Sequence, residues 1–292
     1  MRGWFVHNRF FYTQAFRDQA DCFRAAAERK GILLDFQTNT ETRALLIGDS
    51  AEGLLPDFVL FWDKDVPLAQ TLEKAGVPVY NPSEAIRLCD DKTLTYLALA
   101  HTGIPMPETV PVPFSFGPVS WDSEPLIDKA ADALGYPLVV KASHGSFGQQ
   151  VWLANNRTEL VARLNALSPE PALLQRYVRF SHGRDKRLYV IGDRVAAAML
   201  RTSEADFRAN LALGGKAEII RPNEEETEIA LRACGELGLV FGGVDLLFGE
   251  DGHPLLCEVN SNAHIRNLSR LSGVPLAERI LEEIVSRLSA GA

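Results

Sequence analysis

The sequence predicts an α/β protein made of more than one small lobe. Short apolar runs of the kind found in buried strands alternate with longer segments whose apolar residues recur at helical spacing. Several of the longer segments are followed at once by glycine, as at Gly31 and Gly76, which is typical of a helix that ends before a strand. With 292 residues, the chain is long enough to form two or three lobes around cores of their own.

The first part of the chain predicts a small α/β lobe. We expect strands at residues 3–6, 33–37, 58–62 and 77–80, and helices at residues 16–30 and 67–75. The sequence Asn-Pro-Ser-Glu at residues 81–84 then predicts the start of a further helix.

A proline-rich stretch separates this lobe from the rest. A helix at residues 92–101 should end at Gly103, and five prolines between residues 105 and 118 predict an extended, irregular segment, where we place a domain boundary. Beyond it we expect strands at residues 138–142, 151–154, 172–175, 187–191 and 194–200, helices from residue 127, at 157–166 and at 224–237, and a hairpin that begins near Asp245.

The composition argues against several classes of protein. Hydrophobic residues make up 46% and charged residues 23% of the chain, as in ordinary folded proteins. A net charge of −8 argues against nonspecific binding to nucleic acids or anionic membranes. No apolar run approaches the ~20 residues that span a bilayer. The four cysteines form no C-x-x-C pair, and the first residues lack a signal-peptide core, so we expect a cytoplasmic protein.

The predicted C-terminal hairpin carries three side chains with oxygen atoms. Glu258 and Asn260 share one strand face, and a four-residue loop at residues 249–252 would pair Asp245 with Leu256 on that face. Such hard oxygen ligands suit Mg²⁺ bound beside nucleotide phosphates. The alternative is a hairpin whose acids face water.

A glycine-rich turn follows the strand at residues 138–142. Gly145 and Gly148, on either side of Ser146, would let backbone N–H groups approach phosphate oxygens closely, although a structural hairpin is the alternative. Lys141 lies just before this turn, where its ammonium group could reach the same oxygens or belong to an edge strand. Lys92 could act likewise, or pair with acids on a helix surface.

Three further segments carry polar groups suited to binding. The connector at residues 175–178 could offer peptide groups to an adenine edge, or be a plain linker. Asp185 and Arg187 share a strand face, and Arg187 could bind a phosphoryl group or a carboxylate, or form a cross-strand ion pair. Arg208 and Asn210 precede two glycines and could face bound anions from a mobile loop, or be solvated surface.

Taken in chain order, these motifs resemble those of the ATP-grasp ligases, and among them the RimK-like branch. The resemblance runs from about Asp90 to the C-terminus, and the preceding lobe looks like the small domain that comes before the grasp fold in that family. It implies an ATP-grasp fold of two α+β lobes preceded by a small α/β domain. The implied domains are residues 1–89, residues 90–178 with the glycine-rich flap, and residues 179–292 with the metal site.

The resemblance also implies a role for each motif. The residues on the nucleotide would be Lys92, Lys141, Gly145, Ser146, Gly148, Gln175, Arg176, Tyr177, Val178 and Asp185, the last as a ribose or hinge-side acid. The Mg²⁺ ligands would be Asp245, Glu258 and Asn260. The groups around the reacting phosphoryl and carboxylate would be Arg187, Arg208 and Asn210.

The implied activity is that of an ADP-forming carboxylate–amine ligase that works through an acyl phosphate and could add glutamate or another amino acid. Its cofactors would be ATP and Mg²⁺, with Mn²⁺ as a substitute, and its partners a carboxylate and an amine, with no nucleic acid and no membrane. A homo-oligomer is also an expectation, which rests only on how common homo-oligomers are among soluble proteins. The alternatives are an ATP-grasp small-molecule kinase and a non-catalytic ATP-binding regulator.

One segment departs from the family pattern. Residues 261–267, Ser-Asn-Ala-His-Ile-Arg-Asn, stand where many RimK-like enzymes have a Ser-Pro-Gly type continuation. The departure puts glutamate addition in doubt without touching the ATP and metal residues. His264 and Arg266 could contact an acidic substrate or cap the final helix.

Overall fold

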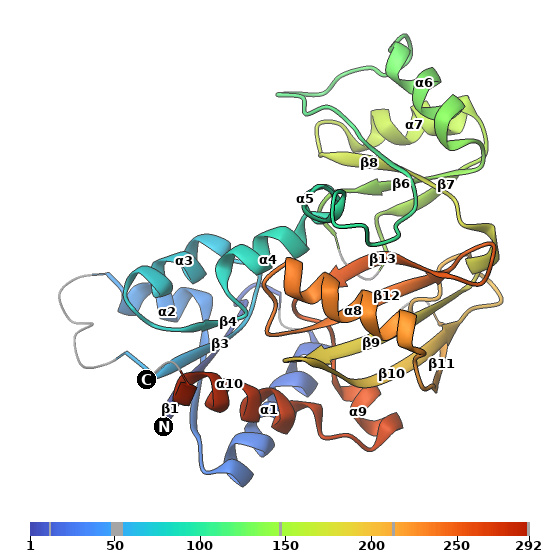
Figure 1. The fold of residues 1–292 in the computed structure, drawn as a ribbon. Helices are drawn as coiled ribbons and strands as arrows, with labels where there is room; N and C mark the ends of the chain where they lie inside the picture. The colour runs from blue at the N-terminus through green and yellow to red at the C-terminus, as the bar shows by residue number, and fades with distance from the viewer. Residues whose placement is uncertain (12, 48–54, 146–147, 212–213, 291–292) are drawn as a thin grey trace.

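The structure is a computed structural model that describes residues 1–11, 13–47, 55–145, 148–211 and 214–290. Its strands form three sheets, and helices pack against each of them (Figure 1). The mixed α/β class that the sequence predicts is therefore confirmed. One sheet falls within each of the three expected segments, whereas the boundaries of those segments stay predictions.

The N-terminal sheet is parallel and has the strand order β2-β1-β3-β4. Its strands are β1 (Arg2–His7), β2 (Leu33–Thr38), β3 (Phe58–Trp62) and β4 (Val79–Tyr80), and its helices are α1 (Gln14–Lys30), α2 (Asn39–Leu45) and α3 (Val66–Lys74). Every residue of β3 is buried, which suits its unbroken apolar sequence, because parallel sheets are covered on both faces. Thr38 and Asp65 begin α2 and α3 by accepting backbone hydrogen bonds.

The central sheet is antiparallel and has the order β5-β8-β6-β7. Its strands are β5 (Thr109–Pro111), β6 (Leu138–Ala142), β7 (Val151–Ala154) and β8 (Ala172–Arg176). The associated helices are α6 (Pro125–Leu134) and α7 (Arg157–Leu167), with α4 (Ser83–Asp90) and α5 (Lys92–Leu99) leading in from the first lobe. Leu138 and Val140 pack with Ile127 and Leu160 in a core that belongs to this lobe alone.

The C-terminal sheet is antiparallel and has the order β11-β10-β9-β12-β13. Its strands are β9 (Arg184–Ile191), β10 (Arg194–Thr202), β11 (Lys216–Ile219), β12 (Phe241–Phe248) and β13 (Pro254–Asn260), after a short 3-10 turn, η2 (Arg179–Ser181). Its helices are α8 (Glu224–Glu236), α9 (Arg266–Ser272) and α10 (Leu276–Ala290). Leu188 and Val190 of β9 pack in the core on the α8 face, and Tyr189 and Ile191 in the core that contains α10, as strand alternation requires.

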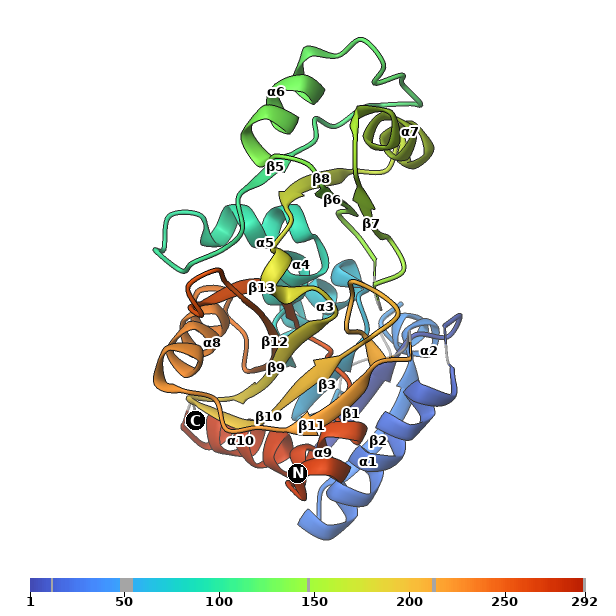
Figure 2. The same ribbon diagram turned by 90° about the vertical axis from the view of Figure 1, so that its right-hand side faces the viewer.

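The N-terminal and C-terminal lobes share a hydrophobic core, whereas the central sheet packs with α6 and α7 in a core of its own. Trp62 of β3 stacks on Phe241 of β12 with ring centroids 5.9 Å apart, and α1 lies beside α10 (Figure 1). In Figure 2 the central lobe stands above the five-stranded sheet, and the chain descends from β8 into it. The two outer lobes therefore form one continuous body, and the central sheet has a separate core.

Several elements follow the sequence prediction closely and others were missed. β3, β6 and β7 have the predicted bounds, whereas the strand expected at residues 77–80 begins only at Val79. The elements that the sequence did not predict were α2, β5, β11 and the bounds of α9 and α10. β5 and β11 are short edge strands whose pairing comes from a neighbouring strand rather than from an apolar pattern. In the described part of the chain, no helix is both long and apolar enough to cross a membrane.

The expected register of the C-terminal hairpin is wrong. Asp245 lies opposite Glu258 rather than Leu256, which pairs with Leu246. The loop is one residue longer than expected, because Phe248 pairs with Pro254, and an irregularity in β13 adds Cys257 as a further residue. This shift brings two carboxylates directly opposite each other across the strand pair.

One buried side chain fastens the N-terminal lobe to the C-terminal sheet. The Asn81 amide nitrogen donates to the carbonyls of Phe241 and Ser261 at 2.9 and 3.0 Å, and its oxygen accepts from the Val240 N–H at 2.8 Å. Asn81 is fully buried, so no water replaces these bonds if the side chain is removed.

We predict that Asn81→Ala lowers the free energy of unfolding by about 3 kcal/mol, because buried backbone groups lose their partners. Denaturant unfolding followed by circular dichroism would measure the change. The exposed Asn155, whose side chain contacts Glu159, provides the matched control, and Asn155→Ala should change stability by no more than about 0.5 kcal/mol. Equal effects of the two substitutions would contradict the fastening role.

Candidate active site

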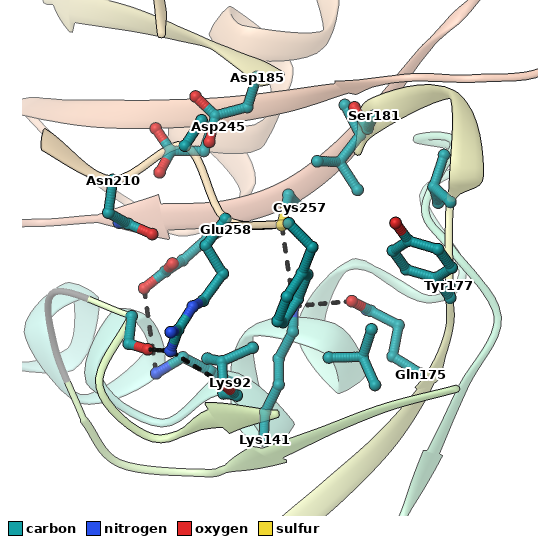
Figure 3. Close-up of a pocket in the computed structure, with 18 of the residues that line it drawn as sticks. Lys92, Lys141, Gln175, Tyr177, Ser181, Asp185, Asn210, Asp245, Cys257 and Glu258 are labelled. Carbon is teal, nitrogen blue, oxygen red and sulfur yellow. Dashed lines mark hydrogen bonds and ion pairs between the residues drawn. The ribbon is translucent and has the colours of Figure 1, made fainter. Parts of the chain in front are cut away.

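A cavity of about 110 Å³ lies between the central lobe and the C-terminal sheet (Figure 3). The central lobe contributes residues from β6, β7 and β8, and the C-terminal lobe contributes residues from β9, β10, β12 and β13. We call it the smaller cavity. The residues of it that the sequence predicted as site residues are Lys92, Lys141, Gly145, Gly148, Gln175, Arg176, Tyr177, Val178, Asp185, Arg208, Asn210, Asp245 and Glu258.

Lys141 places a buried positive charge in the smaller cavity. Only 7% of the residue is exposed, and its ammonium group donates to the Gln175 side-chain oxygen at 2.7 Å and lies 3.7 Å from the Cys257 sulfur. Gln175 is oriented by donating its nitrogen to Thr109 at 2.9 Å. Among the described residues, no carboxylate forms an ion pair with Lys141. Because a buried charge normally has a partner, this ammonium group points to an anionic ligand.

Lys92 links the glycine-rich turn to the C-terminal hairpin. It is the first residue of α5, which Asp91 caps by accepting from the Thr93 N–H at 2.8 Å. The Lys92 ammonium group donates to the Gly145 carbonyl at 3.0 Å and lies 4.0 Å from a Glu258 carboxylate oxygen. Both lysines therefore converge on one cavity from different elements, as Figure 3 shows.

The glycine-rich turn is held against the loop that carries Arg208. Arg208 donates to the carbonyls of Gly148 and Val151, the latter at 3.1 Å. Gly148 has a φ of 71°, and a Cβ at this position would lie 2.6 Å from the Asn210 side-chain oxygen, so the close approach requires glycine. The predicted site residue Ser146 lies outside the described residues.

The end of β8 and the residues that follow it line the smaller cavity, while the side chains of Arg176 and Tyr177 contact residues outside the nucleotide site predicted from the sequence. The Arg176 guanidinium donates to Glu108 at 2.9 Å, and the Tyr177 hydroxyl lies 2.5 Å from the His182 ring nitrogen Nδ1. β8 ends at Arg176, so the peptide groups of Tyr177 and Val178 lie beyond the strand. A ligand at this edge would meet peptide groups and the Tyr177 ring.

Four charged side chains form a network on β9, β10 and β12, in which Arg201 and Asp245 are buried and Asp185 and Arg187 are partly buried. Asp245 accepts from Arg187 at 2.7 and 2.6 Å and lies 2.9 Å from an Arg201 nitrogen. Arg201 also donates to both oxygens of Asp185, at 2.6 and 2.8 Å. Burial alone would raise the pKa of Asp245, but the charges and hydrogen bonds of Arg187 and Arg201 outweigh it and hold the pKa below its usual value.

This network bears on one sequence prediction and contains one residue that the sequence analysis missed. Asp185, expected as a ribose or hinge-side acid, has both carboxylate oxygens engaged by Arg201. Arg201 itself was missed, although it is only 3% exposed and lines both cavities of the site. A charged residue inside the apolar run of β10 was the available sequence signal. Asp185 holds Arg201 toward Asp245, whereas a contact of Asp185 with ribose stays a prediction.

The three predicted metal ligands lie on two neighbouring strands. Asp245 is opposite Glu258, and Asn260 follows on the same strand as Glu258. The Asn260 side-chain nitrogen is buried and has no hydrogen-bond partner in the described part of the chain. Asp245 already accepts hydrogen bonds from Arg187 and lies beside Arg201, but two carboxylates and an amide oxygen are the types of ligand that suit Mg²⁺. The donor set therefore fits the metal that the sequence predicts.

A second cavity, of about 640 Å³, adjoins the first and reaches the N-terminal lobe. We call it the larger cavity. It shares Gly148, Arg201, Asn210 and Glu258 with the smaller cavity, and it is also lined by the predicted residues Arg187 and Asn260. Every predicted site residue within the described chain thus lines one of two adjoining cavities. Their individual roles stay predictions.

His264 and Arg266, which belong to the segment that differs from the family pattern, lie in different places. His264 lines the larger cavity and packs edge-on against Phe16, with ring centroids 5.3 Å apart. Burial and the nearby Arg187 charge lower the pKa of His264 to about 4, so the ring is neutral at neutral pH and brings no charge to an acidic substrate. Arg266 begins α9 and pairs with Asp18 of α1.

Known proteins are similar to this chain in sequence, and others are similar to it in fold. The family model of the RimK-like ATP-grasp domain matches residues 89–284. The probable alpha-L-glutamate ligase of Legionella pneumophila (strain Corby) is 36% identical over 216 residues, which are 73% of this chain and 68% of that protein. Human N-acetylaspartylglutamate synthase A is 37% identical over 202 residues, which are 68% of this chain and 50% of that protein.

The chain thus spans about half the length of the human relative. Among solved structures, the D-alanine–D-alanine ligase of Bacillus anthracis superimposes with a TM-score of 0.77 at 18% identity, over 100% of both chains, which shows the shared fold. The match of the family model covers most of the chain and contains both lobes that line the smaller cavity. The chain belongs to the RimK-like ATP-grasp family of ligases.

Proposed function

We propose that this chain is an ADP-forming ligase that joins a carboxylate to an amine through an acyl phosphate. The observation that carries the proposal is the buried ammonium group of Lys141, which forms no ion pair with a carboxylate among the described residues. The cavity that it lines is also lined by Asp245 and Glu258. A buried cation beside hard oxygen ligands suits a nucleotide phosphate accompanied by a divalent metal. Family membership supports the same reading, since the related proteins are ligases and synthases.

ATP would lie between the central lobe and the C-terminal sheet. Lys92 and Lys141 would contact its phosphates, and the glycine-rich turn with Gly145 and Gly148 would close over them. The adenine would meet peptide groups of residues 175–178. The smaller cavity of about 110 Å³ is below the range of about 300–1,000 Å³ that is typical of ligand pockets, so we expect the central lobe to move outward when the nucleotide enters.

Asp245, Glu258 and Asn260 would hold Mg²⁺, or Mn²⁺ in its place. The bound metal would neutralise phosphate charge and orient the transferred group. Within the chain, Arg201 is held by Asp185 and in turn holds Asp245, which fixes the position of that carboxylate. Glu258 lies near Lys92, so the phosphate-binding and metal-binding groups are also in contact.

The reaction would proceed in two balanced steps. A carboxylate oxygen of the substrate attacks the γ-phosphorus, the bond to the bridging oxygen breaks, and ADP leaves. The amine then attacks the acyl carbon, inorganic phosphate leaves, and the amine proton passes to solvent. Arg187, Arg208 and Asn210 would stabilise charge on the phosphoryl and carboxylate groups. The closed turn would exclude water, which otherwise hydrolyses the acyl phosphate.

Glutamate is the first amine to test, because it occurs in the names of both relatives described above. The departure at residues 261–267 leaves other amino acids open. We place the reaction in the cytoplasm, where ATP is supplied; the free state of all four cysteines is compatible with that reducing compartment.

The proposal is tested by Mg²⁺-dependent ADP release with pooled amino acids, metabolite carboxylates and short acidic peptides, followed by mass spectrometry of the mixture. A product heavier than a substrate by one amino-acid residue would support a ligase. A phosphorylated substrate would favour a kinase. ATP binding without ADP release in any mixture would favour a regulator and contradict the proposed activity.

We predict that Glu258→Gln reduces Mg²⁺-dependent ADP release at least about 100-fold, because it removes a charged metal ligand while keeping the side-chain shape. ADP production by a coupled assay would measure the loss, and circular dichroism would confirm an intact fold. Glu236→Gln, at an exposed position of α8, is the matched control and should leave turnover unchanged. Near-normal turnover of Glu258→Gln would remove the metal assignment.

We predict that Lys141→Ala weakens ATP binding by about 10- to 100-fold, since a charge-assisted hydrogen bond to phosphate contributes about 1.5–3 kcal/mol. Isothermal titration calorimetry would measure the affinity. Lys129→Ala, at an exposed position of α6 in the same lobe, should bind ATP like the unmodified protein. An unchanged affinity of Lys141→Ala would show that the phosphates bind elsewhere.

A further inference from the structure

The larger cavity lies at the topological switch point of the N-terminal sheet. In the order β2-β1-β3-β4, the chain leaves β1 toward β2 on one side and later returns to β3 on the other side. Ligands of open α/β sheets bind outside the carboxyl ends of the strands at such a point. Asn8 follows β1, Trp62 ends β3 and Asp63 follows it, and all three line the larger cavity.

Asp63 presents a fixed carboxylate to this cavity. Only 7% of the residue is exposed. Its oxygens accept from the Asn8 side-chain nitrogen at 3.1 and 3.3 Å and from the Lys64 backbone N–H at 2.7 Å. These donors are neutral, so they orient the carboxylate without balancing its charge. Burial, with the nearby Asp65 charge, raises the pKa of Asp63 against the lowering effect of those hydrogen bonds and of His7.

The other carboxylates of the larger cavity have cations beside them. Asp90 pairs with Lys64, and Glu258 lies 4.0 Å from the Lys92 ammonium group. Asp63 forms no ion pair of this kind among the described residues, and the one basic group whose charge acts on it is His7. A buried carboxylate without a cation is costly, and a positively charged ligand would remove that cost.

A second hydrogen-bond acceptor lies next to Asp63. Asn262 donates its side-chain nitrogen to the Asp63 carbonyl at 3.0 Å, which assigns the orientation of the amide because a carbonyl can only accept. The Asn262 side-chain oxygen is then left buried, with no hydrogen-bond partner among the described residues. An ammonium group carries three N–H donors and suits such a pair of acceptors.

Unpartnered donors line the same cavity. Trp62 is 1% exposed, and its indole N–H has no acceptor among the described residues. The Asn260 side-chain nitrogen, also in the cavity wall, is likewise buried without a partner there. Buried donors and acceptors are normally satisfied, so their presence around one cavity indicates a ligand that supplies both kinds of group. An amino acid offers ammonium donors and carboxylate acceptors.

We propose that Asp63 and Asn262 form a subsite for the ammonium group of an amino-acid substrate, whose carboxylate accepts hydrogen bonds from Trp62 and Asn260. This subsite rests on the proposed ligase activity and gives it a substrate class, one that binds in the larger cavity. The nucleotide and the amino acid then occupy adjoining cavities that share Glu258 and Arg201. The subsite belongs to the first lobe and to the segment after β13, outside the nucleotide-binding motifs.

Ligand-dependent thermal stabilisation of the full chain tests the subsite. The probes are the standard L-amino acids, each added singly at millimolar concentration without nucleotide, and any that stabilises is compared with its deaminated acid. We expect at least one amino acid to raise the unfolding midpoint and its deaminated acid to have no effect. Asp63→Asn should weaken that amino acid's affinity by about tenfold or more, since a charged partner is lost.

Two further variants complete the test. Asp35→Asn, a matched change at a surface ion pair of the same lobe, should bind the amino acid normally. Asn262→Ala should weaken amino-acid binding severalfold. If Asp63→Asn does not fold, the affinity of Asn262→Ala still tests the subsite. The proposal is overturned if no amino acid stabilises the unmodified protein, if the deaminated acid binds equally well, or if both site variants keep full affinity.

The outcome is separable from that of the proposed function, because binding is measured without ATP. Asp63-dependent binding in a protein that releases no ADP would support the subsite and contradict the ligase. ADP release with unaltered amino-acid dependence in Asp63→Asn would support the ligase and contradict the subsite.

Discussion

The site depends on the pairing of acidic and basic side chains around the buried Asp245. Asp245 lies opposite Arg187 in the register of β12 and β9, and Asp185 lies opposite Arg201 in the register of β9 and β10. Cross-strand partners of opposite charge make it possible to bury Arg201 and Asp245, with Asp185 and Arg187 partly buried beside them on three adjacent strands. A slip of one residue in either pairing would turn these side chains to opposite faces, so the network and the strand register require each other.

The division of the cores suits our expectation that the smaller cavity widens when the nucleotide enters, while the charged network stays fixed. The N-terminal and C-terminal lobes share one core through Trp62 and Phe241, whereas the central lobe has its own. Polar contacts join the lobes at the smaller cavity, from Lys92 to Glu258 and from Arg208 to Gly148. Polar contacts can open without exposing a hydrophobic core, so the proposed entry of the nucleotide would not require the core shared by the other two lobes to open.

Much of the fold and of the candidate site follows from local sequence, because apolar runs and glycines act over short distances. β3, β6 and β7 are examples, and the motifs quoted from the sequence gather around two adjoining cavities. The pairing of Asp245 with Glu258 could not be predicted, since an irregularity at Cys257 has no local signal. Asp63 and Asn262 are 199 positions apart, and only the packing of two lobes brings them together.

The central claim is that the substrate carboxylate is phosphorylated before the amine attacks. The most direct measurement uses a carboxylate labelled with ¹⁸O, once the product has identified it, and determines the mass of the phosphate released. An acyl phosphate transfers one labelled oxygen to each phosphate, because the attacking oxygen stays on phosphorus when the acyl carbon is attacked. Unlabelled phosphate, or phosphate that remains on the substrate, would contradict the account.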